Sequence, residues 1–563
     1  MRAVVYPRDL QPELLSQGAI PDIRLTDPGM QFPDEINITE HFLDRHLEGE
    51  QAGRIAYYSG ERKITYRELH EDVNRLASGL RALGIDKGDR VVLRIPNCIE
   101  FVVCALALHR LGAVVVPTNV LLRERILSYI TNTAEAKAVI AHHEFLEDVE
   151  AGRSRSATVG HFIAVGGDAD SLGRAGYLSY EELIRSSNPP VPSVKVRLDD
   201  LATMFFTSGT TGWPKGCMHL TLTIMAGPHT ALHMFDRIGP RDVISGTPPL
   251  AFTFGYGNML LLPLLCGAPC VLIEGRPRPE VIFTTIEKHR VTIFQSVPAA
   301  YNQMLSVPDA QKRYDLGSLR AALSGSAPLL ASTFQQWEQR FGIRMSNGMS
   351  SSECYVSIFS RWRADPRPGS LGDPLPGWEV RILDDDGKDC PRGKIGRLAV
   401  RGQAANLYWR NPEKQAEAVV DGWSLTGDLI YQDEDGCYWH VCRGDDVIKS
   451  RGYRISPGEV EDTLMEHPAV FEPAVIGVPD PIQGQRVKAF VALKPGYRSS
   501  AGLADELKRF LRERLAAYQV PGEIEFIEAL PKTETGKIRR KDLKELEEQR
   551  HAAAATAAKG AIG

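Results

Sequence analysis

A run of hydroxyl residues and glycines at residues 207–216 is the stretch of this sequence best suited to chemistry. It reads Thr207-Ser208-Gly209-Thr210-Thr211-Gly212-Trp213-Pro214-Lys215-Gly216. Successive backbone N–H groups in a loop with so little side-chain bulk can turn toward one anion, and the hydroxyls add further donors. Lys215 supplies a positive charge at the far end, so the loop is suited to a polyphosphate. The G-x-x-x-x-G-K-[ST] spacing of a Walker loop is absent, and a flexible turn is the alternative interpretation.

The same run resembles the phosphate loop of the adenylate-forming superfamily, which includes acyl- and aryl-CoA ligases, adenylation domains and luciferases. The resemblance implies that the loop contacts ATP or AMP through Thr207, Ser208, Gly209, Thr210, Thr211, Gly212 and Lys215. A second segment resembles the small-residue turn along which adenine lies in that family, namely Gly325-Ser326-Ala327-Pro328. A flat ring needs close approach to the backbone, which small residues permit. An ordinary loop is the alternative for this second segment.

Three serines before a carboxylate, Ser350-Ser351-Ser352-Glu353, form a third candidate segment. ATP needs a divalent cation, and a hard cation prefers oxygen ligands. The segment resembles the family element in which a hydroxyl contacts the α-phosphate and a glutamate helps to hold Mg²⁺. Ser352 and Glu353 match those two positions, and a solvated Ser-rich turn is the alternative.

A Thr-Gly-Asp turn and an Arg-Gly-Asp segment follow in the C-terminal third of the chain. Asp428 matches the family carboxylate that accepts hydrogen bonds from both ribose hydroxyls, although Thr-Gly-Asp alone is an ordinary β turn. By resemblance, Arg443 contacts ribose or phosphate and Asp445 is the hinge about which a C-terminal domain rotates. Gly452 would line the channel for the pantetheine arm of CoA, and Cys442 stands where the family usually has glycine.

The segment Pro531-Lys532-Thr533-Glu534-Thr535-Gly536-Lys537 matches the catalytic-lysine loop of the family. A run of charges usually marks a solvated surface, but this order of residues is too particular for that interpretation. Lys537 is therefore the predicted catalytic cation, which bridges the substrate carboxylate and the α-phosphate while pyrophosphate leaves. Two anions must meet in that step, so charge stabilisation and positioning carry most of the catalysis.

The identity of the acid rests on residues 246–258, which look like the aryl-CoA ligases for benzoate and 2-aminobenzoate. The predicted pocket residues are Thr253, Phe254, Gly255 and Val356. Walls made by Phe254 and Val356 would be apolar and flat and would suit an aromatic ring, while Thr253 could bond a ring substituent. Plain core packing is the alternative for each aromatic side chain.

The resemblance therefore predicts an ATP-dependent aryl-CoA ligase. The enzyme would form an acyl-adenylate and pass the acyl group to CoA, with ATP, Mg²⁺ and CoA required. Two other functions stay open: an aryl-adenylating enzyme that loads a carrier-protein thiol, and a nucleotide-binding regulator without turnover.

Bulk composition excludes several other classes. The chain has 563 residues, a hydrophobic fraction of 43% and a formal charge of −5, which indicates a soluble protein of more than one domain with no basic surface for nucleic acid or membrane. Nine cysteines without a C-x-x-C pair suggest buried thiols in a reducing compartment. Because a signal peptide and a membrane-spanning segment are both absent, we expect a cytoplasmic enzyme, and a homodimer is compatible with the sequence.

Alternating strand and helix patterns predict an α/β fold. The box Thr65-x-x-Glu68 should begin a helix that Gly84 stops, followed by a strand at 90–93, a helix at 100–111 and a strand at 113–116. We expect an irregular arm over residues 1–50, a surface connection at 166–198, a second α/β series from 221 to 343, and an antiparallel sheet or small barrel from 379 to 438. The predicted domains are 1–443, a mobile α+β domain at 444–550, and a disordered tail at 551–563.

Overall fold

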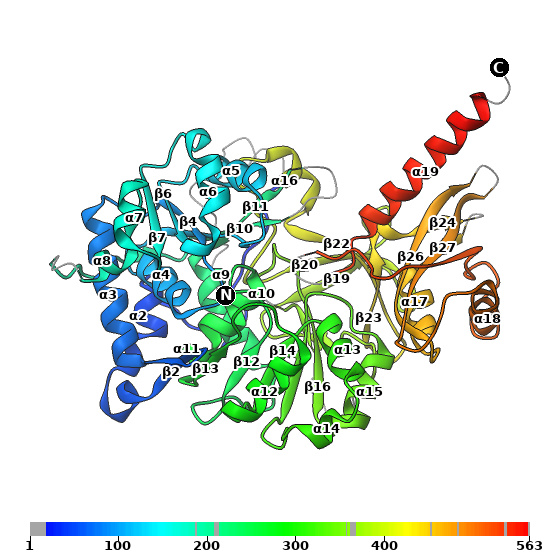
Figure 1. The fold of residues 1–563 in the computed structure, drawn as a ribbon, viewed down its shortest axis with the longest axis horizontal. Coiled ribbons are helices and arrows are strands. Elements are labelled where there is room, and N and C mark those ends of the chain that lie inside the picture. Colours follow the sequence, from blue (N-terminus) through cyan, green and yellow to red (C-terminus); the bar gives the residue numbers. More distant parts are fainter. Residues whose placement is uncertain are drawn as a thin grey trace.

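The computed structural model describes residues 19–185, 189–207, 213–355, 357–360, 367–450, 453–480, 483–533 and 537–560, with the backbone alone at 454 and 551–560. Two α/β sheets and an antiparallel sheet form the larger part of the molecule, and the C-terminal residues form a separate lobe beside them (Figure 1). This arrangement confirms the predicted α/β fold.

The first sheet has seven strands and carries the hydroxyl–glycine run at one edge. Its strands in spatial order are β11 (Lys215–Leu220), β10 (Leu201–Thr207), β5 (Val114–Pro117), β4 (Arg90–Arg94), β6 (Ala138–His142), β7 (His161–Val165) and β8 (Leu178–Ser179). All neighbouring strands are parallel except the β10–β11 hairpin. The helices in this part of the chain are α3 (Tyr66–Ala82), α4 (Ile99–Arg110), α5 (Glu124–Thr133), α6 (Leu146–Gly152), α7 (Ala169–Arg174), α8 (Tyr180–Arg185), η3 (His143–Phe145) and η4 (Arg153–Arg155).

The second sheet has nine strands, with parallel pairing through its centre. In spatial order these are β18 (Asp373–Pro374), β17 (Phe359–Ser360), β16 (Arg344–Met349), β15 (Ala321–Ser324), β14 (Ile293–Ser296), β12 (Ile244–Gly246), β13 (Cys270–Leu272), β2 (Ile55–Ser59) and β3 (Arg62–Thr65). Its helices are α9 (Thr221–Leu232), α10 (Thr253–Gly255), the π-helical η5 (Tyr256–Leu261), α11 (Leu262–Cys266), α12 (Pro279–His289), α13 (Pro298–Ser306), α14 (Ala310–Arg313) and α15 (Ala331–Phe341).

One main hydrophobic core joins the two sheets. α4 contacts strands of both, and only Glu100 in this helix is not fully buried. A helix that is apolar on all sides belongs inside a core rather than on a surface. The predicted capping box is present at the start of α3, because Thr65 and Glu68 exchange hydrogen bonds with each other's backbone. Gly84 follows the helix with φ of +80°, so the predicted stop is also confirmed.

An antiparallel sheet forms the third layer, as the Asp/Gly turns predicted. Its strands are β19 (Glu379–Leu383), β20 (Gly396–Arg401), β22 (Trp423–Gln432), β21 (Val419–Val420) and β23 (Tyr438–Arg443), with α16 (Pro412–Ala418) between β20 and β21 in the chain. β22 and β23 are neighbours in this sheet, so residues from both strands can reach one site.

The C-terminal residues have their own sheet and their own two hydrophobic clusters. The strands are β24 (Ile448–Ser450), β25 (Tyr453–Ile455), β26 (Val470–Asp480), β27 (Gly484–Leu493) and β28 (Glu523–Phe526), and the helices are η6 (Gly444–Asp446), α17 (Pro457–Met465), α18 (Ala501–Arg512) and α19 (Arg540–Gly560). The backbone of α19 stays helical past residue 550, where alanine, the best helix former, dominates the sequence. α19 projects away from the rest of the molecule in Figure 1.

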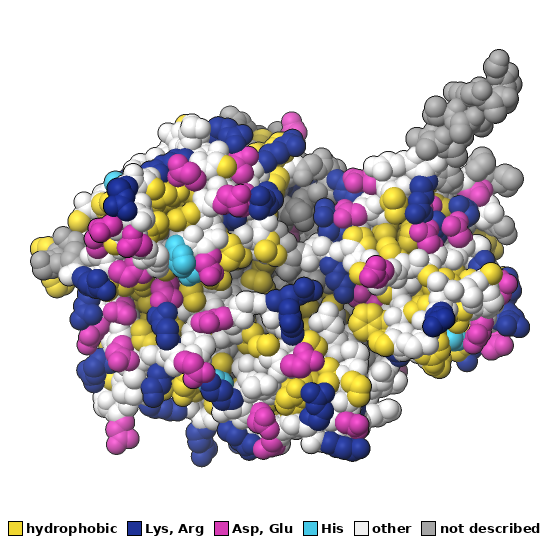
Figure 2. All heavy atoms as spheres, viewed as in Figure 1, with side chains coloured by type: hydrophobic (Ala, Val, Ile, Leu, Met, Phe, Trp, Pro, Cys, Tyr) yellow, Lys and Arg dark blue, Asp and Glu magenta, His cyan; other side chains and the backbone are white. Residues whose placement is uncertain are grey.

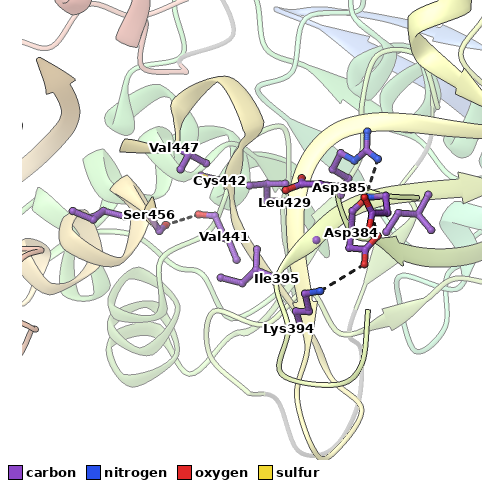
Figure 3. Close-up of a pocket in the computed structure, with 14 residues that line it drawn as sticks. Asp384, Asp385, Lys394, Ile395, Leu429, Val441, Cys442, Val447 and Ser456 are labelled. Atoms are coloured by element: carbon purple, nitrogen blue, oxygen red, sulfur yellow. Dashed lines mark hydrogen bonds and ion pairs between the residues drawn. The ribbon is translucent and has the colours of Figure 1, made fainter. Parts of the chain in front are cut away.

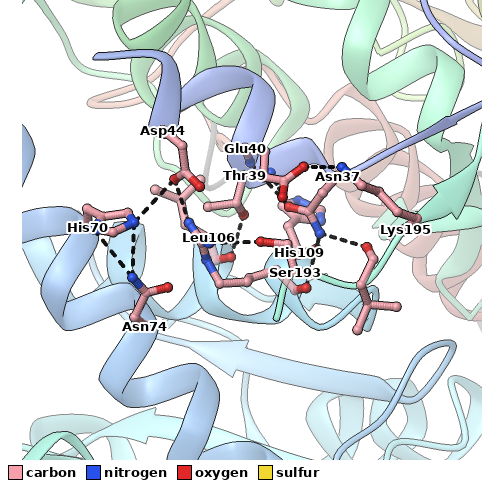
Figure 4. A network of polar contacts seen from close by, with 12 residues as sticks. Asn37, Thr39, Glu40, Asp44, His70, Asn74, Leu106, His109, Ser193 and Lys195 are labelled. Carbon is pink, nitrogen blue, oxygen red and sulfur yellow. Dashed lines mark hydrogen bonds and ion pairs between the residues drawn. The ribbon is translucent and has the colours of Figure 1, made fainter. Parts of the chain in front are cut away.

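The described part of the predicted N-terminal arm, residues 19–50, is more ordered than predicted. Besides β1 (Glu35–Ile36), which pairs with β9 (Val196–Arg197), it contains α2 (Ile38–Phe42), η1 (Asp44–His46) and η2 (Gly49–Gly53). Asn37 connects this arm to the rest of the protein. Its side-chain oxygen caps α2, and its amide donates to the carbonyls of His109, Arg110 and Val194 at 2.8–3.1 Å (Figure 4). The connection predicted at 166–198 also contains α7, β8, α8 and β9, so neither segment is irregular throughout.

The surface in view in Figure 2 mixes acidic and basic side chains over both lobes, without a large area of one sign. Among the described residues, none of the helices combines the length and the apolar character that crossing a membrane requires.

Candidate active site

The described ends of the hydroxyl–glycine run belong to the β10–β11 hairpin. The two strands are antiparallel, with Thr207 opposite Lys215, and the centre of β10 is buried as the apolar run predicted. After the loop, Trp213 is 43% exposed and stacks on Tyr129 at 4.7 Å between ring centroids. Five of the predicted phosphate contacts lie outside the described residues, namely Ser208, Gly209, Thr210, Thr211 and Gly212. Thr207 and Lys215 hold the two ends of the loop.

A tyrosine beside β11 reaches the predicted magnesium carboxylate. Residues 407–409 run along β11, where the amide of Met218 donates to the carbonyl of Leu407 at 2.9 Å. The Tyr408 hydroxyl then donates to Oε1 of Glu353 at 2.9 Å. Burial, and then the charge of Glu353, raises the pKa of Tyr408, so the phenol keeps its proton. Tyr408 thereby holds one carboxylate oxygen of Glu353 next to the β10–β11 hairpin.

A histidine in β11 holds the segment that contains Ser352. The imidazole of His219 forms a hydrogen bond with the Ser352 backbone, and burial lowers the pKa of His219 to about 3 against the opposing effect of that bond. His219 is therefore neutral at physiological pH. The hairpin and the Ser352–Glu353 pair are thus connected by two independent contacts.

Asp428 is a buried carboxylate with two cationic or polar neighbours. It follows Gly427, whose φ of +82° requires glycine, and it lies opposite Arg443 in the β22–β23 pair. Its Oδ1 is 3.2 Å from Nε2 of His440, and its Oδ2 is 3.6 Å from a guanidinium nitrogen of Arg443. Burial acts to raise the pKa of Asp428, but the His440 hydrogen bond and the Arg443 charge outweigh it, so the pKa lies below its ordinary value. The carboxylate is therefore ionised and able to accept hydrogen bonds.

Lys537 reaches this cluster from the C-terminal lobe. Its backbone closes a tight turn, because the Lys537 amide donates to Oγ1 of Thr533 at 3.0 Å and the Thr533 amide donates back to the Lys537 carbonyl at 2.7 Å. Lys537 is exposed, although neighbouring protein groups displace part of the water around its side chain. Removal from water, and then the charge of Arg443, lowers the pKa of Lys537, whereas Asp428 and Glu353 oppose that decrease. The structure thus brings together four predicted site residues that are far apart in the sequence.

The predicted adenine turn and acid pocket lie against each other. Gly325 follows β15, and its amide donates to the Ser296 carbonyl at 3.0 Å. A Cβ added at Gly325 would lie 3.2 Å from the ring of Phe254, so that ring packs directly on the turn. Ser326 has φ of +68° and bends the chain away toward Ala327 and Pro328.

The other predicted pocket residues start the helix that follows β12. Thr253 is half-buried at the first position of α10. A Cβ at Gly255 would lie 2.0 Å from the Pro249 carbonyl oxygen, so only glycine fits there. Val356 lies outside the described residues.

The predicted hinge is tied to the start of α19. Asp445 lies in η6, and Nζ of Lys544 donates to its carbonyl at 3.1 Å and to Oδ1 of Asp446 at 3.0 Å. Gly452 lies outside the described residues.

The sequence matches two families of known domains. Residues 43–409 match the AMP-binding enzyme family, and residues 459–537 match the C-terminal domain of AMP-binding enzymes. The chain belongs to the AMP-binding enzyme family. The predicted membership of the adenylate-forming enzymes is therefore confirmed.

Individual AMP-binding enzymes resemble the chain over nearly its whole length. It is 34% identical to a benzoate–CoA ligase of Thauera aromatica, over 93% of this chain and 98% of that protein. It is 33% identical to an acetyl-coenzyme A synthetase of Bacillus subtilis, over 91% and 90% of the two chains. Among solved structures, an anthranilate CoA ligase in complex with anthranoyl-AMP has a TM-score of 0.87 at 33% identity, over 93% of this chain and 100% of that one.

A cavity of about 340 Å³ lies elsewhere in this AMP-binding enzyme, between the antiparallel sheet and the C-terminal lobe (Figure 3). Asp384 and Lys394 lie on one side, and Val447 and Ser456 lie on the other. None of the predicted site residues is among those that line it. The cavity therefore does not mark the nucleotide site.

Sequence reasoning missed three residues of the site: Tyr408, His219 and His440. Each acts through a partner that is distant in the sequence or on a neighbouring strand, and none lies in one of the motifs described above. The one local signal concerns His440: it lies two residues before Cys442 in β23, and residues two apart in a strand point to the same face of the sheet.

Proposed function

We propose that this AMP-binding enzyme is an ATP-dependent aryl-CoA ligase. It joins an aromatic carboxylate to AMP with release of pyrophosphate, and then transfers the acyl group to the thiol of CoA with release of AMP. The observation that carries the proposal is the approach of Lys537 to Asp428, Arg443 and Glu353. The printed names of the benzoate and anthranilate ligases support an aromatic acid.

In the first half-reaction the carboxylate attacks the α-phosphate of ATP. Lys537 and Lys215 reduce the repulsion between these two anions, and Ser352 donates to the α-phosphate with the loop at 207–212. Asp428 accepts from the ribose hydroxyls, and Arg443 contacts ribose or phosphate. The adenine lies along residues 325–328.

Glu353 would hold Mg²⁺ together with the phosphates of ATP. One or two carboxylates plus phosphate oxygens are the usual protein site for this ion, and Tyr408 orients the Glu353 carboxylate for that role. The bound ion neutralises phosphate charge.

In the second half-reaction the CoA thiol attacks the acyl carbon, and AMP leaves. The proposed domain boundary follows residue 443, and the domain 444–550 rotates about Asp445 between the two steps. Rotation withdraws Lys537 and brings Gly452 to the pantetheine channel. A hinge of one or two residues can absorb the necessary dihedral change.

The acid binds between the adenine turn and α10. Phe254 supplies a flat apolar wall, Gly255 keeps the backbone close, and Thr253 and Val356 complete the pocket. Because Phe254 already packs on Gly325, the ring of the acid would lie near the adenosine, as an acyl-adenylate requires.

A pyrophosphate-release assay with ATP, Mg²⁺ and a panel of acids tests the proposal. We expect benzoate, 2-aminobenzoate or 2-hydroxybenzoate to support release, and thioester to form with CoA alone. Preference for acetate would contradict the aryl assignment, and thioester on a carrier protein but not on CoA would favour the carrier-loading alternative. Absence of pyrophosphate with every acid would favour a regulator. The cytoplasmic location and the homodimer stay predictions.

A further inference from the structure

Three buried polar atoms near the proposed acid pocket have no hydrogen-bond partner in the part of the chain that the structure describes. They are Oγ1 of Thr203, Nε2 of His219 and the hydroxyl of Tyr355. Their residues are 0%, 1% and 3% exposed. Burying an unpaired polar atom costs free energy, so each such atom in a folded protein calls for a reason, such as a bound water or a ligand.

The three atoms belong to one cluster. Thr203 lies directly opposite His219 in the β10–β11 pair. The rings of His219 and Tyr355 are 5.3 Å apart, and Phe205 packs against both, at 5.5 and 6.2 Å. Tyr256 packs on the same phenylalanine at 5.6 Å, but its hydroxyl is 2.7 Å from Nε2 of His109. The Tyr256 hydroxyl therefore has a hydrogen-bond partner in the protein, whereas the Tyr355 hydroxyl has none among the described residues.

The cluster lies between the proposed phosphate contacts and the proposed acid pocket. β10 ends at Thr207, and His219 bonds to the Ser352 backbone. On the opposite side, a Cβ at Gly257 would lie 3.6 Å from the Tyr355 hydroxyl oxygen, and Gly257 comes two residues after Gly255. An acid whose carboxylate meets the α-phosphate at Ser352 would extend its ring toward this region.

Tyr355 also has a strained backbone. Its φ of +63° is the left-handed conformation, which is unusual for a bulky residue. Strain of this kind concentrates at functional sites, where the surrounding structure holds it in place. The unpaired hydroxyl and the unusual φ are independent observations on the same residue.

Nε2 of His219 and the hydroxyl of Tyr355 can bind the same ligand group. His219 is neutral, so one of its ring nitrogens can donate and the other can accept, and Nε2 has no partner among the described residues. The Tyr355 hydroxyl can donate as well as accept. A group that both donates and accepts, such as a hydroxyl or an amine on an aromatic ring, matches this pair, whereas an unsubstituted ring would leave both atoms unpaired.

We propose that Tyr355 and His219 determine specificity by binding a polar substituent on the ring of the aromatic acid. The inference rests on the proposed function and narrows its substrate class to hydroxy- or aminobenzoates. A site built to bond a substrate hydroxyl or amine rejects the analogue that lacks it, because its own polar groups then stay unpaired.

The test compares Tyr355→Phe with the wild type and with the matched control Tyr256→Phe. kcat/KM is measured for benzoate and for its 2-, 3- and 4-hydroxy and amino derivatives. We expect Tyr355→Phe to lower kcat/KM for the preferred substituted acid about tenfold or more, the size of one lost hydrogen bond, with little change for benzoate. Tyr256→Phe should change all acids by a common factor, because its hydroxyl bonds His109.

A second variant, His219→Asn, keeps a polar group near the Nδ1 position and removes Nε2. It should show the same loss for the substituted acid. An equal effect of Tyr355→Phe on all acids would overturn the proposal, as would a wild-type preference for benzoate over every derivative. In both cases pyrophosphate release persists, so this failure differs from failure of the ligase assignment, in which no acid supports release.

The melting temperature gives a measurement that does not depend on turnover. Removing a hydroxyl that has no partner among the described residues should leave the melting temperature of Tyr355→Phe unchanged or raised, whereas Tyr256→Phe should lower it. A marked decrease for Tyr355→Phe would show a structural role of the hydroxyl and would also overturn the proposal.

Discussion

The proposed role of Lys537 depends on its positive charge, and its surroundings affect how readily it keeps that charge. Partial removal from water, and then the nearby charge of Arg443, lowers the pKa of Lys537 below the ordinary lysine value. Two carboxylates limit the decrease, Asp428 and Glu353. Residues of the proposed ATP site therefore influence the pKa of the proposed catalytic lysine.

The lowered pKa predicts an alkaline limit for the first half-reaction. A lowered pKa means that Lys537 loses its proton at a lower pH than an exposed lysine does, so adenylate formation should decline as pH rises, with a midpoint below 10.5. In Lys537→Arg the guanidinium stays charged in that range, so any residual activity should lack this decline. The measurement is the pH dependence of pyrophosphate release in both proteins, and the same decline in both would assign it to another group.

At the scale of single elements, the first two turns of α19 connect the proposed hinge to the body of the C-terminal lobe. Lys544 bonds the Asp445 carbonyl and the Asp446 carboxylate. One turn earlier, Arg540 donates to both oxygens of Glu461 at 2.6–2.7 Å, and Glu461 also accepts from the Val475 amide at 2.7 Å. Because Lys537 comes three residues before Arg540, these bonds connect the proposed hinge to the segment that follows Lys537.

Breaking this connection should loosen the hinge without removing a group that touches substrate. Lys544→Met keeps the length of the side chain and removes its two hydrogen bonds. We expect the activation free energy of adenylate formation to rise by about 1 kcal/mol, which lowers its rate about fivefold. The melting temperature should change little. Lys541→Met is the control, because Lys541 lies in the same part of α19 and pairs with Glu545 at an exposed position, at 3.6 Å. Equal effects of the two variants on the rate would exclude a hinge role for Lys544.

Elements with strong local signals were predictable from the sequence, and elements fixed by distant contacts were not. The capping box of α3 and the buried strand β10 follow from spacing alone. The order in the N-terminal arm could not be seen, because it depends on Asn37 binding carbonyls as distant in the chain as Val194. The contact of Tyr408 could not be predicted for the same reason, because its partner Glu353 is 55 residues away in the sequence.

On the scale of the whole molecule, the site is complete only when the two lobes face each other. Asp428 and Arg443 come from adjacent strands of the antiparallel sheet, and Glu353 comes after β16 of the second sheet. Lys537 alone comes from the C-terminal lobe, which has separate hydrophobic clusters. A lobe with its own core can change its orientation without loss of packing elsewhere. This construction fits a reaction in two steps that need different groups.

Lys537→Ala should therefore separate the two half-reactions. We expect it to reduce adenylate formation by about two to three orders of magnitude, the usual effect of losing one key electrostatic group, and to leave thioester formation from preformed acyl-adenylate nearly unchanged. The control is Lys532→Ala, since Lys532 belongs to the same loop but pairs with Glu472 at 2.8 Å. Both steps are measured separately, by pyrophosphate release and by consumption of synthetic acyl-adenylate with CoA. Equal loss of the two steps would mean that Lys537 stays in the site throughout the reaction, which contradicts rotation about Asp445.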